Sequence, residues 1–135
     1  MTAARSDIHD RAQIVRLVDS FYGAVRADDL LGPIFDDIAQ TDWAVHLPKM
    51  YDFWETVLFG RSMFRGNPLA VHLNLATRAP LTNREFSRWL ALFEQQVDRL
   101  FTGPIAEDAK MRARRIAAVM HHHVEAHAAS MAASA

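Results

Sequence analysis

The sequence predicts an all-α protein that folds as a single domain. Apolar residues recur at helical spacing in several segments, capping residues stand before two of them, and no segment has the pattern of a strand. The chain has 135 residues, the length of one ordinary domain, and 50% of them are hydrophobic, enough for a sizeable core. We expect the core to span about residues 10–127 and the small residues of the C-terminal tail to fray.

The first helix is predicted to begin after Asp10, which forms a capping-box-like pair with Gln13. Its apolar face consists of Ile14, Leu17, Val18, Phe21, Tyr22 and Val25. The charged segment RADD at 26–29 interrupts this pattern, and the following LLGPIF at 30–35 predicts a corner.

A second helix is predicted to start after Thr41 or Asp42 and to end near Gly60. Its apolar stripe contains Trp43, His46, Met50, Phe53, Trp54, Val57 and Leu58. Pro48 lies inside this stripe, where it removes one backbone donor and crowds the carbonyl four residues back. We therefore expect either a kink or a late start.

Three further helices are predicted in the second half of the chain. A short one covers NPLAVHLN, with Asn67 as N-cap and Pro68 at the first helical position. Thr82 and Glu85 form a capping box for a long helix that ends at Gly103-Pro104, with Phe86, Trp89, Leu90, Phe93, Val97, Leu100 and Phe101 on its apolar face. The last helix is expected to place Ile116, Val119, Met120, His123, Val124 and His127 on one face.

Composition excludes several classes of function. The formal net charge of −1 and the scattered basic residues argue against nucleic acid as a partner. The chain has no cysteine, so disulfides, thiolate metal sites and thiol nucleophiles are excluded. The polar N-terminus MTAARSDIHD and the absence of a long apolar tract predict a cytoplasmic protein without a signal peptide or membrane span.

Common catalytic motifs are also missing. The glycines form no phosphate-cradling loop, no G-x-S-x-G elbow occurs, and no glutamate has a histidine three residues later, as di-iron helical bundles require. The histidines 121–123 and 127 resemble a metal site, since 123 and 127 are four apart on a helix, but no third ligand is evident, so we interpret them as a polar helix end.

One group of four residues could form a functional site. His72 lies on the short apolar helix, Tyr22 on the first helix, His46 early on the second and Trp89 on the long one. Each has an ordinary explanation, since buried histidine, tyrosine and tryptophan often only satisfy a hydrogen bond within a core. Together they could instead line an apolar slot that holds a flat cofactor through one imidazole.

Several motifs follow one another in a specific order and spacing: Phe21-Tyr22 with Val25, Leu31-Gly32-Pro33-Ile34-Phe35, His46 to Asp52-Phe53-Trp54, Pro68-Leu69 with His72-Leu73 and Leu75, and Phe86 with Trp89-Leu90 and Leu92-Phe93. From about Asp10 to His127 the chain resembles the truncated haemoglobins of group III. The assignment to group III rests on His46 and on the lack of the glycine pairs that mark the other groups of truncated haemoglobins.

The resemblance implies a two-over-two helical sandwich, a single globin domain around haem b. His72 then corresponds to the proximal iron ligand, and the implied distal residues are Tyr22, Phe21, His46 and Trp89. The other implied contacts of the haem are Phe35, Met50, Lys49, Leu69 and Leu75, with Lys49 placed to reach a propionate. We expect the second ring nitrogen of His72 to donate to a carbonyl one turn back, that of Pro68 or Leu69.

The resemblance further implies reversible binding of dioxygen and other diatomic ligands. Tyr22 or Trp89 would donate a hydrogen bond to the ligand, and His46 would either donate as well or swing outward as a gate. Oxygen, peroxide or nitric oxide chemistry with an external reductase is left open, as is the competing interpretation, a cofactor-free helical interaction or sensor domain in which His72 is merely buried.

Overall fold

The computed structural model describes residues 5–60 and 66–133. Its elements, in chain order, are α1 (Arg11–Ala27), the π-helix η1 (Ile34–Ile38), α2 (Trp43–Phe59), α3 (Pro68–Ala76), α4 (Asn83–Leu100) and α5 (Pro104–Ala133). Over these residues there is no strand, only one isolated parallel bridge between Ser6 and Phe101. The all-α prediction is confirmed.

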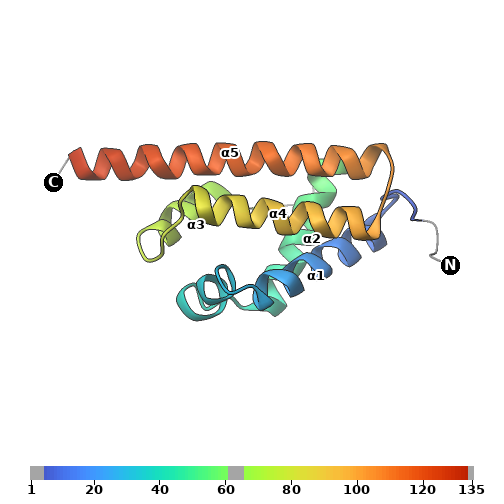
Figure 1. Ribbon diagram of the computed structural model, residues 1–135, viewed down its shortest axis with the longest axis horizontal. Coiled ribbons are helices and arrows are strands. Elements are labelled where there is room, and N and C mark those ends of the chain that lie inside the picture. The colour runs from blue at the N-terminus through green and yellow to red at the C-terminus, as the bar shows by residue number, and fades with distance from the viewer. Residues whose placement is uncertain (1–4, 61–65, 134–135) are drawn as a thin grey trace.

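The helices form two packed pairs. The long helix α5 runs the length of the molecule beside α4, while α1 packs on α2 (Figure 1). The two pairs meet where α1 contacts α4 and α2 contacts α5, and α3 lies against α5. This is the expected two-over-two sandwich, with the aromatic rings of Phe21, Trp54 and Phe93 buried at its centre.

The predicted helix boundaries agree with the structure where capping residues mark them. Asp10 and Gln13 form a complete capping box for α1, and Thr82 and Glu85 form one for α4. Helix α2 ends at Gly60, whose left-handed backbone (φ 70°) suits glycine. These helix ends are specified by neighbouring residues alone, which explains why the sequence predicts them well.

Pro48 does not delay the start of α2. The helix begins at Trp43 with Asp42 as its N-cap and continues through Pro48, so the late start that we considered is wrong. The corner at 30–35 also contains more structure than expected, because the π-helix η1 begins there at Ile34.

The packed face of α5 differs from the predicted stripe. Val119 is 52% exposed, and His123 and His127 are exposed too. Of the predicted positions, Val124 is buried. The other buried positions of α5 are alanines that the predicted stripe did not include: Ala106, Ala109, Ala113 and Ala117. Small side chains let α5 approach α4 closely, but they give a weak hydrophobic signal in the sequence. Helix α5 also continues to Ala133 rather than fraying after His127.

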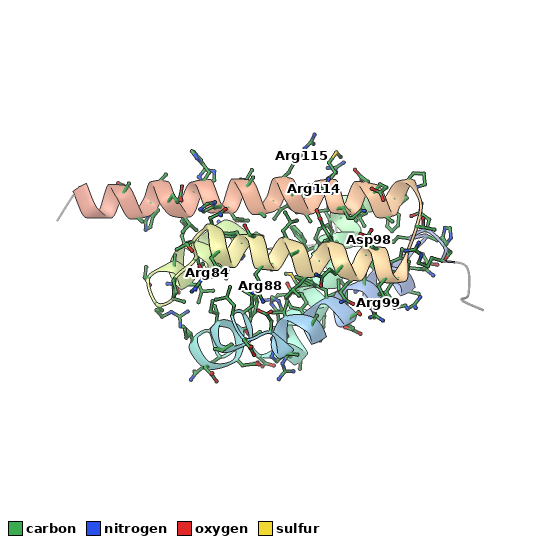
Figure 2. The ribbon with its side chains drawn as sticks, viewed as in Figure 1. Arg84, Arg88, Asp98, Arg99, Arg114 and Arg115 are labelled. Carbon is green, nitrogen blue, oxygen red and sulfur yellow. The ribbon has the colours of Figure 1, made fainter. Side chains whose placement is uncertain are left out.

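Charged side chains connect α4 to its neighbours on the face shown in Figure 2. Arg88 forms an ion pair with Asp28 at 2.6 Å, and Arg114 on α5 forms one with Glu94 at 2.6 Å. Exposed ion pairs of this kind contribute about 0–1 kcal/mol each, so the apolar interior provides most of the stability. No helix within the described part of the chain is long and apolar enough to span a membrane.

Asp7 holds the N-terminal segment against the start of α5. Its carboxylate accepts backbone hydrogen bonds from Ile8 at 2.8 Å, Ile105 at 3.0 Å and Ala106 at 2.8 Å. Partial burial opposes ionisation, but these donors outweigh it and hold the pKa of Asp7 below its ordinary value. A side chain at Gly103 would lie 2.5 Å from the Asp7 carboxyl carbon, and Gly103 has φ of 140°, so only glycine fits there.

Asp7→Ala is expected to reduce the free energy of unfolding by about 1 kcal/mol, the usual value of a lost helix cap. Because the pKa of Asp7 is lower in the folded protein than in the unfolded chain, this contribution is complete above the unfolded pKa of about 4. It is lost as the pH falls through the folded value. Urea denaturation of both proteins against pH checks this, and equal stability at neutral pH would show that the contacts contribute nothing.

Candidate functional site

A cavity of about 640 Å³ lies within the sandwich and receives side chains from every helix. This volume falls in the range of about 300–1,000 Å³ that is typical of cofactor and ligand sites. Most of the lining is aliphatic or aromatic, and the charged side chains in it are those of Lys49, Arg78 and Glu85. The sequence-predicted residues that it brings together are Tyr22, Phe35, His46, Lys49, Met50, His72, Leu75 and Trp89.

His72 projects into this cavity from α3. Its Nδ1 lies 2.6 Å from the carbonyl oxygen of Pro68, one turn back, as the sequence predicts. A carbonyl can only accept, so Nδ1 is the donor in this contact, and in the neutral tautomer with that proton Nε2 keeps its lone pair. Pro68 at the helix start thus fixes both the tautomer and the ring plane of His72, in the way that orients metal-binding histidines.

Tyr22 and His46 meet on the side of the cavity formed by α1 and α2. Their ring centroids are 5.0 Å apart, in an edge-to-face arrangement. Burial raises the pKa of the Tyr22 hydroxyl well above its ordinary value, so the phenol keeps its proton and remains a donor. Burial, together with the charges of His72 and Lys49, lowers the pKa of His46.

The Nε2 atom of His46 is buried and has no hydrogen-bond partner among the residues that the structure describes. A buried polar atom without a partner costs about 1–3 kcal/mol. His46 therefore lacks something to which it can hydrogen-bond within the cavity.

Trp89 and Phe21 take different places. Trp89 lines the cavity from α4, whereas Phe21 is 1% exposed and does not contribute to the lining. The Phe21 ring packs instead against the rings of Tyr22 at 4.8 Å, Trp89 at 5.5 Å and Phe93 at 5.3 Å. The structure thus places Phe21 one layer behind Tyr22 and Trp89, where it supports them.

The remaining predicted contacts lie around the cavity. Met50 and Lys49 line it from α2, Phe35 from η1 and Leu75 from α3. The backbone of Leu69 belongs to α3, but its side chain lies outside the described part of the structure, so its predicted contact is not placed.

Arg78 is a lining residue that sequence reasoning missed. It follows α3, and its guanidinium donates to the Ile38 carbonyl at 3.2 Å and to Asn74 Oδ1 at 3.4 Å. These bonds hold it between η1 and α3. Because the contact with Ile38 spans 40 residues of sequence, no local pattern could have predicted it.

Glu85 also lines the cavity, but its carboxylate is fully engaged. It accepts a hydrogen bond from Thr82 N at 2.8 Å as part of the α4 capping box, and another from Arg84 Nε at 3.1 Å. Glu85 is 2% exposed, and although burial opposes ionisation, these bonds keep its pKa below the ordinary value. We assign it a structural role.

The histidines near the end of α5 do not line this cavity. His121 approaches Glu125 at 2.8 Å and lies near the ring of Phe86, with centroids 5.3 Å apart, while His122, His123 and His127 are exposed. Across residues 5–60 and 66–133, no three His, Asp or Glu side chains form a metal-binding group.

Replacing His121, His122, His123 and His127 together by alanine is expected to leave haem content and ligand affinity nearly unchanged, because these side chains do not line the cavity. Absorption spectra of the purified variant and carbon monoxide titration measure both quantities. A large loss of either would assign the cluster a role that its position does not suggest.

Comparison with known proteins agrees with this geometry. Residues 6–130 match the bacterial-like globin family. The chain is 33% identical to the group 3 truncated haemoglobin ctb of Campylobacter jejuni over 111 residues, which is 80% of this chain and 85% of that protein.

Solved structures show the same similarity. The crystal structure of the group III truncated haemoglobin from Campylobacter jejuni matches with a TM-score of 0.78 and 30% identity, over 90% of this chain and 95% of that one. The truncated oxygen-avid haemoglobin from Bacillus subtilis matches with a TM-score of 0.69 and 28% identity, over 82% and 92%. Sequence and helix arrangement agree, and this chain belongs to the bacterial-like globin family with the fold of a truncated haemoglobin.

Proposed function

We propose that this globin is a group III truncated haemoglobin that holds haem b through His72 and reversibly binds dioxygen and other diatomic ligands. The observation that carries the proposal is the 2.6 Å contact between His72 Nδ1 and the Pro68 carbonyl. It leaves the Nε2 lone pair of a cavity-lining imidazole available as a ligand for iron.

The other lining residues fit a haem. The aliphatic and aromatic walls suit a flat macrocycle, and the partnerless Nε2 of His46 fits a site where a further polar group is bound. The two cationic lining residues, Lys49 and Arg78, are suited to the two carboxylates of haem.

When bound, a haem held by one histidine would supply an iron that can bind a diatomic molecule. Tyr22 and Trp89 would each present a donor on the distal side, since the buried phenol keeps its proton and an indole N–H can only donate. His46, as a neutral imidazole, could donate or accept there. The apolar walls would limit the entrance of water.

Strong distal donors slow ligand release, which suits chemistry on oxygen, peroxide or nitric oxide better than oxygen delivery. The Bacillus subtilis structure that this chain resembles is named as oxygen-avid, and we propose high affinity for dioxygen here as well. An external reductase and a cytoplasmic location stay predictions.

Lys49 and Arg78 are expected to hold the two propionates of haem. Haem dimethyl ester lacks the propionate charges, so it should bind about tenfold or more weakly than haemin, because at least one charge-assisted hydrogen bond is lost. The variant Lys49→Gln with Arg78→Gln should bind the two compounds with similar affinity. Titration of the apoprotein, followed by absorbance, measures this. If the variant discriminates as strongly as the wild type, the propionates are held elsewhere.

Titration of the wild-type apoprotein with haemin tests the proposed function itself. A Soret band that saturates at one haem per chain, and that shifts on reduction and addition of carbon monoxide, is the expected result. A protein that stays colourless under these conditions would favour the alternative, a cofactor-free helical interaction or sensor domain.

A further inference from the structure

The wall of the main cavity contains two thioether side chains. Met50 lines the cavity from α2 and Met120 lines it from α5, and both side chains are partly buried. The chain has no cysteine, so all of its sulfur belongs to methionine. A thioether takes up one oxygen atom from an oxidant without the loss of any C–H bond. An oxidant inside the cavity therefore meets methionine as the side chain that most readily accepts oxygen.

The two methionines occupy different parts of the cavity wall. Met50 follows His46 by four residues, so their side chains lie on the same face of α2, one helical turn apart. The ring of His46 in turn meets that of Tyr22, with centroids 5.0 Å apart. Met120 belongs instead to α5, the helix on which α3 with His72 packs. Met50 is therefore the methionine next to side chains that are proposed to hold a ligand.

His46 offers a hydrogen-bonding position beside Met50. Its Nε2 atom is buried and has no partner among the residues that the structure describes. Methionine sulfur accepts hydrogen bonds only weakly, whereas a sulfoxide is polar and its oxygen is a strong acceptor. A neutral imidazole with its proton on Nε2 can donate to that oxygen. Oxidation of Met50 would thus place an acceptor one helical turn from the imidazole that lacks a partner.

We propose that Met50 is a modification site at which hydrogen peroxide inside the main cavity converts the thioether to a sulfoxide. The O–O bond of the peroxide breaks, the sulfur lone pair forms a bond to one oxygen atom, and the other oxygen leaves as water. Sulfur is thereby oxidised by two electrons and the peroxide is reduced by two. The inference rests on the proposed function, since bound haem is what would make peroxide react faster at Met50 than at an exposed methionine.

Peroxide treatment of the haem-loaded protein, followed by digestion and mass spectrometry, tests the site. Met50 should gain one oxygen atom about tenfold or more faster than Met111, which is 38% exposed on α5, because reactants held close together react as if at high concentration. The advantage of Met50 should disappear in the apoprotein. Carbon monoxide, which would compete with peroxide for the haem, should protect Met50 and leave the oxidation of Met111 unchanged.

Oxidation of Met50 should also change the release of dioxygen. The sulfoxide oxygen repels a partly negative ligand and competes for the hydrogen bond of His46, so release from the oxidised wild type should be about threefold or more faster. Met50→Leu cannot take up the oxygen atom, and its release rate should be the same before and after peroxide treatment. Stopped-flow measurements on samples that keep their Soret band give these rates.

Met120→Leu is the matched control variant, because it removes the other thioether of the cavity. Its Met50 should gain oxygen as fast as in the wild type, and peroxide should speed its dioxygen release to the same extent. Leucine and methionine have similar volumes, so both variants should fold, and circular dichroism checks this.

Oxidation of Met111 or Met120 before Met50, in protein that keeps its haem, would overturn the modification site and leave the proposed function intact. Equal oxidation of Met50 with and without haem would overturn it too, because exposure alone would then explain the reaction. The same holds if peroxide changes dioxygen release equally in the wild type and in Met50→Leu. A wild-type protein that binds no haem would instead contradict the proposed function, and the modification site with it.

Discussion

Replacing His72 by alanine is expected to yield a protein that purifies largely without haem. Among the cavity-lining residues that the structure describes, His72 is the one whose imidazole donates from one nitrogen to a helical carbonyl, which leaves the other nitrogen available as a ligand. A cofactor that binds only the folded state stabilises it by about 2.7 kcal/mol at a free concentration one hundred times Kd. The variant should therefore also unfold at a lower temperature than the haem-loaded wild type.

Haem content after purification and thermal denaturation followed by circular dichroism measure the two effects. His123→Ala is the matched control, because His123 is exposed on α5 and lies outside the cavity, and it should keep the haem. Full haem content and an unchanged ferrous spectrum in His72→Ala would show that another residue is the ligand.

Removing a distal donor is expected to speed dioxygen release by roughly ten- to a hundredfold. A hydrogen bond to a partly charged group contributes about 1.5–3 kcal/mol, which corresponds to this change in rate. Tyr22→Phe removes only the hydroxyl, and Trp89→Phe removes the indole N–H while keeping most of the aromatic surface. Both residues line the cavity, and the Phe21 ring packs against both of them.

Carbon monoxide provides the internal control for these variants, because its bound form is less polar and should depend less on a donor. Stopped-flow dissociation rates for both gases separate the hydrogen bond from a general loosening of the site. Equal dioxygen release from the wild type and both variants would mean that His46 holds the ligand, or that no distal donor does.

The parts of this fold that were predictable from sequence are those that neighbouring residues specify. The capping boxes at Asp10 and Thr82 involve contacts three residues apart, and the left-handed Gly60 ends α2 through its own backbone. The contact between Pro68 and His72 was predictable for the same reason, since a helix that starts at Pro68 brings its carbonyl close to the imidazole four residues later.

The features that the sequence did not predict depend on contacts across the fold. Adjacent residues of a helix point about 100° apart, so Tyr22 faces the cavity while Phe21 faces the core, and only the packed structure shows which is which. The alanine face of α5 was missed because alanine gives little hydrophobic contrast. Arg78 was missed because it reaches Ile38 on a distant element.

Resonance Raman spectroscopy of the reduced, ligand-free wild-type protein tests the central claim most directly. An iron–histidine stretching band should be present, because the proposed site would hold the haem iron through the imidazole of His72. The band should be absent from His72→Ala and restored when free imidazole is added to the variant. A haem-loaded wild type without this band, or a variant that keeps it unchanged, would contradict the assignment of His72 as the iron ligand.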